Sequence, residues 1–189
     1  MTSRTEFIDN LKNEVQHLKS AVESHFSNLS YDQLQWKPEK GQWGIAECIE
    51  HLVSTNQFYL DRIENRMQDE QSKAETNGEV KHSWLGQKFI NMLHPDSKMK
   101  LKAFGQMLPS QGLTGQEVIK QFIEQQDRVL ELLEQARGYN INKLKIGSPF
   151  LGLLKLRLSD AFKVIIVHEK RHLLQAQGVH KTIGFPGKE

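Results

Sequence analysis

The segment Leu153–Gly178 constrains the fold of this chain most, because it combines the clearest helical pattern with the tightest group of metal-capable side chains. His168 and His172 lie four residues apart, so on a helix they project about 40° from each other. An unpaired polar group in an apolar interior is costly, so two inward imidazoles must be hydrogen-bonded, stacked or bound to a metal. Apolar residues share their side of the helix: Leu158, Ala161, Phe162, Ile165 and Ala176.

Three other segments carry apolar residues three and four apart, which is typical of amphipathic helices. Two of them begin with a capping-box pattern, Ser3 with Glu6 and Thr114 with Glu117. Four such helices without a competing strand pattern predict an all-α four-helix bundle. The three further helical segments are 3–29, 44–67 and 114–136.

The connections between these helices differ in length. Residues 30–43 form a short link with one turn of helix at most, and residues 140–152 form a loop. Residues 68–113 form a long crossover between the second and third helices, polar and exposed over 68–81, with short helical turns near 84–93. We therefore expect one domain over residues 1–189.

Charge and cysteine content exclude several classes of protein. The net charge of +2 over 189 residues is too small to indicate nucleic-acid binding. The basic last quarter either attracts an anionic small molecule or is a solvated face. One cysteine, Cys48, cannot form an internal disulfide, which favours a reducing compartment. The longest aliphatic run, Val164–Val167, is too short to span a membrane, and no secretory signal is visible. We expect a cytoplasmic protein that acts away from membranes.

The spacing of His168 and His172 places two imidazoles on one helix face, close enough to share a metal ion. A facing helix of a bundle would supply the third ligand. HEKRH also fits the H-E-x-x-H pattern of zinc proteases, in which Glu169 would activate a bound water. That alternative is weaker, because a suitable downstream ligand and a strand to hold a substrate are missing. Seven candidates remain for the third ligand: His17, His25, His51, His82, His94, His180 and Cys48.

Two motifs resemble those of the DinB-like metal-binding four-helix bundles: Trp43-x-x-x-Glu47-x-x-x-His51-Leu52, and His168-x-x-x-His172-x-x-Gln175 on the last helix. The resemblance implies that His51, His168 and His172 bind a divalent ion, often zinc or nickel. It also implies a relation to transferases and isomerases that use a low-molecular-weight thiol. Gly44 replaces the usual Ser or Thr helix cap, and the Gln68–Pro109 insertion is long, so the substrate class does not carry over.

The residues around the three histidines allow more than one interpretation. On a helical wheel, His51 falls roughly 140° from the apolar stripe, which indicates an exposed residue, whereas the resemblance places it in a pocket. Glu47 would either accept the ring N–H of His51 or interact with the helix dipole. Gln175 either faces the pocket or is solvated. Glu169 is either an inward general base or is turned aside.

The sequence is compatible with two functions. The first is a metal-dependent transferase or hydrolase that acts on a small molecule, with an open three-histidine site. The second is a non-catalytic metal-binding or stress-response bundle that works by forming a homodimer or by docking to a partner. The apolar stretch from Trp84 to Met107 would supply its contact surface.

Overall fold

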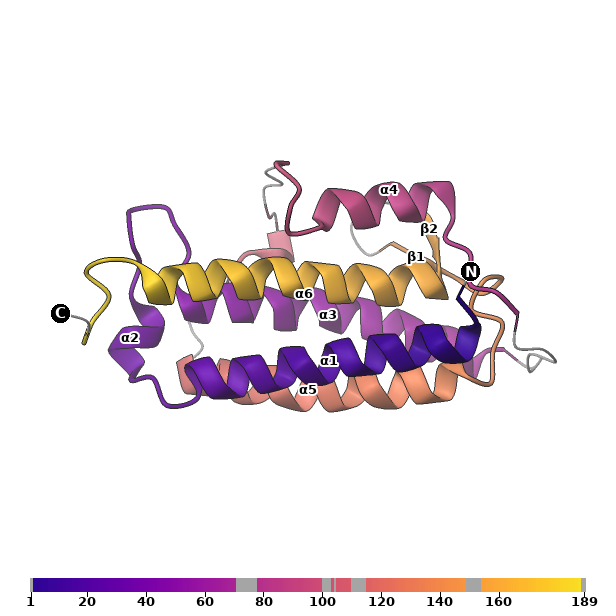
Figure 1. Ribbon diagram of the computed structural model, residues 1–189, viewed down its shortest axis with the longest axis horizontal. Helices are drawn as coiled ribbons and strands as arrows, with labels where there is room; N and C mark the ends of the chain where they lie inside the picture. Colours follow the sequence, from indigo (N-terminus) through magenta and orange to yellow (C-terminus); the bar gives the residue numbers. More distant parts are fainter. Residues whose placement is uncertain are drawn as a thin grey trace.

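Four long helices form the body of the protein in the computed structural model (Figure 1). The structure describes residues 2–70, 78–99, 103, 105–109, 115–148 and 154–187. The predicted all-α bundle is confirmed. Its long helices are α1 (Arg4–Phe26), α3 (Ile45–Gln68), α5 (Gly115–Ala136) and α6 (Leu158–Lys181).

Shorter elements connect the long helices or cover them. The link between α1 and α3 contains α2 (Tyr31–Gln35), the single short helix expected there. The crossover contains α4 (Trp84–Leu93), which packs on α6, and the 3-10 turn η1 (Gly105–Met107). Two strands, β1 (Lys145–Gly147) and β2 (Lys155–Arg157), pair antiparallel just before α6.

Contacts between the long helices fix their directions. Lys12 pairs with Glu134 and Lys19 with Asp127, so α1 and α5 run antiparallel. The ring of Phe26 meets that of His180, which places the C-terminal ends of α1 and α6 together.

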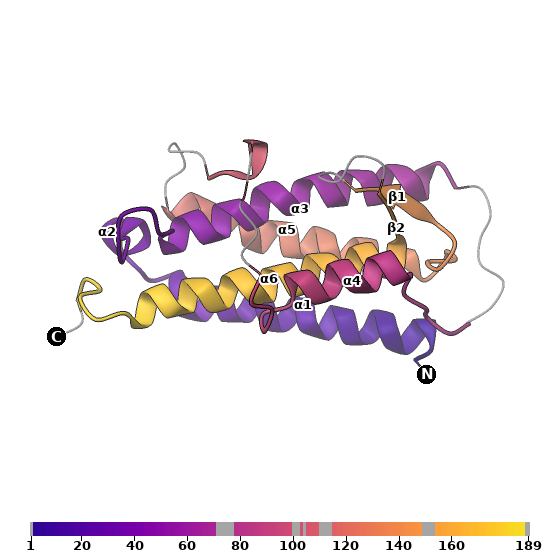
Figure 2. The ribbon, with the colours of Figure 1, turned by 90° about the horizontal axis from the view of Figure 1, so that it is seen from above.

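Helices α3 and α5 run parallel and adjacent, as Figures 1 and 2 show. Their side-chain contacts agree, because Gln125 reaches Val53, and Arg128, further along α5, reaches Asp61 and Glu64, which are further along α3. After α3 ends, the chain must therefore run back along the bundle before α5 can begin. The long crossover is this return, and α4 is its helical part.

The apolar stripes of the four long helices meet in one core. Val15, Val22, Leu60, Phe122 and Ala176 are among its fully buried residues. Each fully buried aliphatic or aromatic side chain contributes about 1.5–3 kcal/mol, so this core holds the helices that position the site.

Helix ends follow the sequence signals where the structure describes them. The Ser3 hydroxyl accepts a hydrogen bond from the Glu6 amide, as its capping pattern predicts. At the start of α3, a Cβ on Gly44 would lie 2.6 Å from the carbonyl oxygen of Trp36, so no Ser or Thr cap fits. The Glu47 carboxylate instead accepts from the Gly44 amide at 3.0 Å.

Two boundaries differ from the expectation. Residues Lys145–Gly147 and Lys155–Arg157 form a small hairpin where a loop and the start of a helix were expected. Helix α6 therefore begins at Leu158 and continues to Lys181, past Gly178.

Some expectations fall on residues that are not described. Thr114 of the second capping box and residues 71–77 of the polar stretch lie outside the described residues. Among the helices that are described, none combines the length and the apolar character needed to cross a bilayer.

Candidate metal centre

Three histidines meet between α3 and α6. His51 comes from α3, and His168 and His172 come from α6, one helical turn apart. Their potential ligand atoms all lie within 4.8 Å of one another. His51 is 4% exposed and His168 is 8% exposed. The structure therefore brings the histidine motif on α3 and the histidine motif on α6 together at one place in the interior.

The ring of His51 is held by the backbone of the crossover. Its Nδ1 lies 2.7 Å from the carbonyl oxygen of Met107, and because a carbonyl can only accept, Nδ1 carries the proton. The Nε2 atom is then free of hydrogen and lies 3.2 Å from Nε2 of His168. A hydrogen bond of this kind fixes the tautomer and orientation of a metal-binding ring.

His172 has a similar arrangement within its own helix. Its Nδ1 lies 3.0 Å from Oε1 of Gln175, which leaves Nε2 to face the other two rings. The indole of Trp43 packs beside this group, with ring centroids 4.9 Å from His51 and 5.7 Å from His172. Trp43 and Gln175 therefore restrict the motion of the rings.

The surroundings favour neutral imidazoles. Burial lowers the pKa of His51, although its hydrogen bond to Met107 opposes this. Burial, aided by the nearby His172, His51 and Arg171, lowers the pKa of His168 well below its ordinary value. Burial and the neighbouring His51 lower the pKa of His172 to about 3. Neutral rings offer the lone pairs that a metal ion requires.

The donor set fits a divalent ion. In a tetrahedral zinc site with Zn–N bonds of about 2.0–2.1 Å, two ligand nitrogens lie about 3.3 Å apart. The Nε2 atoms of His51 and His168 are 3.2 Å apart. Imidazole nitrogen suits zinc and nickel alike. Three protein ligands leave coordination positions open, which is the pattern of catalytic rather than structural sites.

The three imidazoles line a cavity of about 930 Å³. Its mouth includes the exposed residues Gln42, Gln175 and Gly178. Its other end lies between α3, α4 and α6, among buried side chains. The described lining residues include no aspartate or glutamate, so neutral groups and one arginine, Arg171, surround the histidines.

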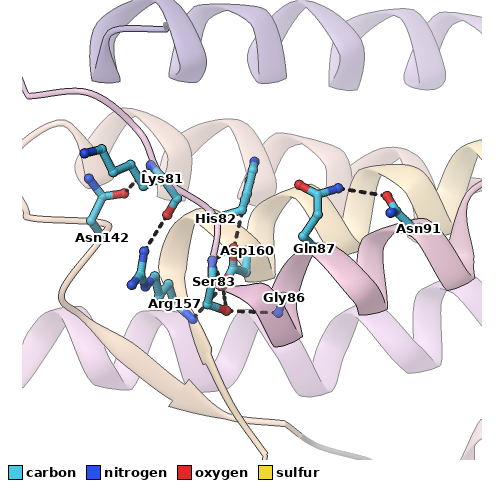
Figure 3. A network of polar contacts seen from close by, with 9 residues as sticks. All are labelled: Lys81, His82, Ser83, Gly86, Gln87, Asn91, Asn142, Arg157 and Asp160. Atoms are coloured by element: carbon cyan, nitrogen blue, oxygen red, sulfur yellow. Dashed lines mark hydrogen bonds and ion pairs between the residues drawn. The ribbon is translucent and has the colours of Figure 1, made fainter.

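The N-terminal end of α4 is tied to the start of α6 by Asp160 (Figure 3). This fully buried carboxylate accepts hydrogen bonds from Nδ1 of His82 at 2.8 Å and from the hydroxyl of Ser83 at 2.6 Å. The Ser83 hydroxyl in turn accepts from the Gly86 amide at 2.9 Å and caps α4. A Cβ on Gly86 would lie 2.2 Å from the Asp160 carboxylate, so this position requires glycine.

The C-terminal end of α4 is tied to α6 by Arg171. Its guanidinium donates to the backbone carbonyls of Met92, His94, Ser97 and Met99, at distances from 2.6 to 3.5 Å. Both ends of α4 are therefore attached to the helix that carries two of the histidines. This attachment makes α4 a fixed wall of the cavity.

Glu47 does not have the role considered for it beside His51. Its carboxylate binds the Gly44 amide and Nζ of Lys37, the latter at 2.8 Å. Both ring nitrogens of His51 face other groups, namely the Met107 carbonyl and His168. Of the two roles left open for Glu47, the structure shows the one at the helix terminus and no hydrogen bond to His51.

Glu169 points away from the histidines into the bundle. It is fully buried and accepts from Nδ2 of Asn56 at 2.6 Å and from Nε2 of Gln126 at 2.9 Å. Burial raises the pKa of Glu169 to about 7, although these two hydrogen bonds oppose the change. It is not among the residues that line the cavity, so the geometry gives it no contact with a group bound at the histidines.

The other candidate ligands lie apart from this centre. His82 binds Asp160, and His180 packs against the rings of Phe26 and Phe185. Cys48 is buried, and burial raises the pKa of its thiol to about 12. In the described part of the chain, His51, His168 and His172 make up the one group of three or more histidine, cysteine or acidic residues close enough to share an ion.

Sequence reasoning missed three groups that shape the site. The Met107 carbonyl has no sequence signal, because any residue supplies a backbone oxygen. Asp160 carried a signal, since it stands three residues after Arg157, whose amide it accepts at 3.4 Å at the start of α6. Arg171 belongs to the basic last quarter, for which the sequence leaves an anion site and a solvated face open, whereas in the structure it holds the end of α4.

Comparison with known proteins gives one family. A family model described as the DinB superfamily matches residues 15–176, a range that contains all three histidines. No curated protein and no solved structure shows a significant match to the chain.

Proposed function

The chain belongs to the DinB superfamily, and on that premise we propose that it is a divalent-metal-dependent enzyme that acts on a small molecule. The observation that carries the proposal is the convergence of His51, His168 and His172 on the wall of a cavity. Zinc and nickel are among the divalent ions that imidazole ligands suit.

A divalent ion held there supplies a Lewis acid and lowers the pKa of a thiol or water that binds it. The protein contributes position and environment. The Met107 carbonyl and Gln175 orient two of the rings, and Trp43 shields them on one side. Beyond the histidines, the inner end of the cavity is lined mainly by buried apolar side chains.

Transfer of a low-molecular-weight thiol fits the cavity better than hydrolysis does. Hydrolases of this type use a carboxylate as general base, and no carboxylate is among the described lining residues. A free thiol has a pKa of about 8.5, far below that of water, so a thiol would need no such carboxylate base at a site that held a divalent ion. Low-molecular-weight thiols occur in the reducing compartment that the free Cys48 favours, so we place the protein in the cytoplasm.

The zinc-protease alternative loses support from the position of Glu169. In an H-E-x-x-H protease the glutamate acts on the metal-bound water, but here Glu169 is hydrogen-bonded to Asn56 and Gln126 in the bundle interior. The Glu169→Gln variant should therefore retain its metal and its metal-dependent turnover. Loss of turnover with metal retained would restore a catalytic role for this residue.

A second function, non-catalytic metal binding with dimerisation or docking, is favoured by one observation. Trp84 and Leu85 are adjacent on α4 and are 75% and 48% exposed. Exposed apolar surface of this kind is what a contact with a partner would cover. A metal-loaded protein that turns over no thiol–electrophile pair, and whose self-association is lost in a Trp84→Ala variant, would favour this function.

Metal content tests whether the three histidines bind an ion. We expect about one zinc or nickel ion per chain in protein purified without chelators, measured by elemental analysis. His51→Ala, His168→Ala and His172→Ala should each lose most of it. His17→Ala is the matched control, because His17 is exposed on α1 and belongs to no such group. Unchanged metal in all three variants would refute the site.

Turnover tests whether the metal-loaded protein is an enzyme. The metal-loaded protein should conjugate thiols with electrophilic acceptors in a panel assay, and removal of the metal should abolish the rate. Restoring zinc or nickel should restore it. Equal rates with and without metal would refute a metal-dependent enzyme, whatever the metal content.

A further inference from the structure

The cavity continues past the histidines into the bundle. We call this part the inner arm, and it is formed by eight residues of three helices. Helix α4 covers it, and α3 and α6 form its other walls. The inner-arm residues are Thr55, Asn56, Tyr59, Phe89, Met92, Leu93, Val164 and Ile165.

The walls of the inner arm are mainly apolar and buried. Val164 and Ile165 of α6 are each 1% exposed, and Phe89 and Leu93 of α4 are at most 9% exposed. None of the eight residues carries a charge. Moving a charged group into such a space is expensive, so the inner arm selects an uncharged occupant.

Two polar atoms in the inner arm lack a partner. Oγ1 of Thr55 and Oδ1 of Asn56 are buried without a hydrogen bond within the described residues. The amide nitrogen of Asn56 is engaged by Glu169 at 2.6 Å, so its oxygen is the atom that remains. Native proteins leave few buried polar atoms unpaired, and an amide oxygen can be satisfied only by an N–H or O–H donor.

We propose that the inner arm is a binding subsite for the uncharged, apolar part of an elongated small molecule that carries one hydrogen-bond donor. A hydroxyl at this place donates to Oδ1 of Asn56 and accepts from the hydroxyl of Thr55, and the remainder of the ligand lies against Phe89, Val164 and Ile165. The identification of this molecule as a substrate rests on the proposed function, because its reactive end then lies at the three histidines. The subsite itself depends only on the walls and the unpaired atoms.

The covering wall of the inner arm is held by contacts within the protein. Asp160 and Arg171 attach the two ends of α4 to α6, so the wall needs no ligand contact to keep its position. A preformed site avoids the entropic cost of ordering a loop. Affinity should therefore follow the apolar area that the ligand buries.

Linear alcohols from 1-butanol to 1-octanol are suitable probes, because each has one hydroxyl donor and an alkyl chain. Titration of metal-free protein, followed by calorimetry and amide chemical shifts, separates the subsite from the metal. Each methylene buried in the inner arm should raise affinity about fourfold, until the inner arm is filled and affinity levels off. Shifts should centre on the inner-arm residues.

Variants locate the binding. Met92→Trp places a large ring in the inner arm and should remove the dependence on chain length. Phe89→Trp is a second filling variant, in case the first does not fold. Leu85→Trp is the matched control, since Leu85 lies on α4 outside the cavity and is 48% exposed. Thr55→Val should lower the affinity for every alcohol about fivefold without changing the gain in affinity per methylene.

The outcomes distinguish the two proposals. Alcohol binding that increases with chain length in the wild type and is lost in the filled variants supports the subsite, even if the protein binds no metal. Absence of such binding, or equal binding in wild type and filled variants, overturns the subsite. If metal binds and thiols react while alcohols do not bind, the proposed function stands and this inference fails.

Discussion

Asp160 provides the sharpest test of how the cavity wall is held. Its carboxylate accepts from His82, from the hydroxyl and amide of Ser83, and from the Arg157 amide, at 2.6 to 3.4 Å. All of these groups are donors. Asp160→Asn keeps the shape of the side chain but turns one acceptor oxygen into a donor NH₂, which then faces other donors.

The size of the effect follows from the number of bonds lost. A hydrogen bond to a charged group contributes about 1.5–3 kcal/mol, and about two of these bonds lose their acceptor in the variant. Partial rearrangement of the Ser83 hydroxyl offsets part of the loss. We expect Asp160→Asn to lower the free energy of unfolding by about 3 kcal/mol.

Urea unfolding followed by circular dichroism measures this difference. Asp127→Asn is the control: it removes an exposed ion pair with Lys19, which should contribute less than about 1 kcal/mol. The substitution should also increase the rate of amide hydrogen exchange more in α4 than in α1 or α5, relative to the wild type. A loss below about 1 kcal/mol at Asp160, or unchanged exchange in α4, would refute the role of this network.

The pH dependence of the free energy of unfolding provides a second test of the role of the Asp160 carboxylate. Burial alone would raise the pKa of Asp160, but hydrogen bonds from His82 and Ser83 outweigh it and lower the pKa below its ordinary 3.8. In the pH range just below that value, the unfolded chain takes up a proton that the native carboxylate does not. Stability from Asp160 is therefore complete above the unfolded pKa and is lost as the pH falls. The wild type should lose more stability than Asp160→Asn over this acid range.

Further predictions concern glycine, metal and thiol chemistry. Gly86→Ala should lower the melting temperature, because its Cβ would meet the fixed Asp160 carboxylate at 2.2 Å, whereas Gly178→Ala has no atom within 4 Å and should raise or preserve it. Zinc at 100 times its Kd should stabilise the wild type by about 2.7 kcal/mol in a thermal shift assay, and a chelator should reverse this. The Cys48 thiol should resist a thiol reagent at pH 8 in native protein and react after unfolding, because burial raises its pKa to about 12; rapid reaction of the native protein would contradict the buried position.

The helical framework was predictable because it depends on local spacing. Apolar residues three and four apart mark each long helix, and Ser3 marks a start that the structure reproduces. The hairpin before α6 was not recognised, although the sequence carries its signal. Residues 154–158 alternate strictly between leucine and a basic residue, which is the period of a strand, but the strong helix that follows outweighed this short pattern.

The position of His51 could not be derived from its own helix. A helical wheel assumes one buried face, whereas α3 has two, one toward the core and one toward the cavity. The second face is buried because Met107 and α4 return over it from a distant part of the chain. Only the resemblance of the two motifs to a known family placed His51 with His168 and His172.

The parallel arrangement of α3 and α5 has a consequence for how such proteins diversify. All three histidines belong to α3 and α6, whereas the cover of the cavity belongs to the crossover that this arrangement requires. The candidate metal ligands therefore lie on α3 and α6 alone, whereas one wall of the inner arm lies in a separate stretch of sequence. Exchanging residues 84–93 between homologous chains should change the apolar fit on that side of the cavity while the three histidines keep their positions, so a change in one segment can alter which molecule fits.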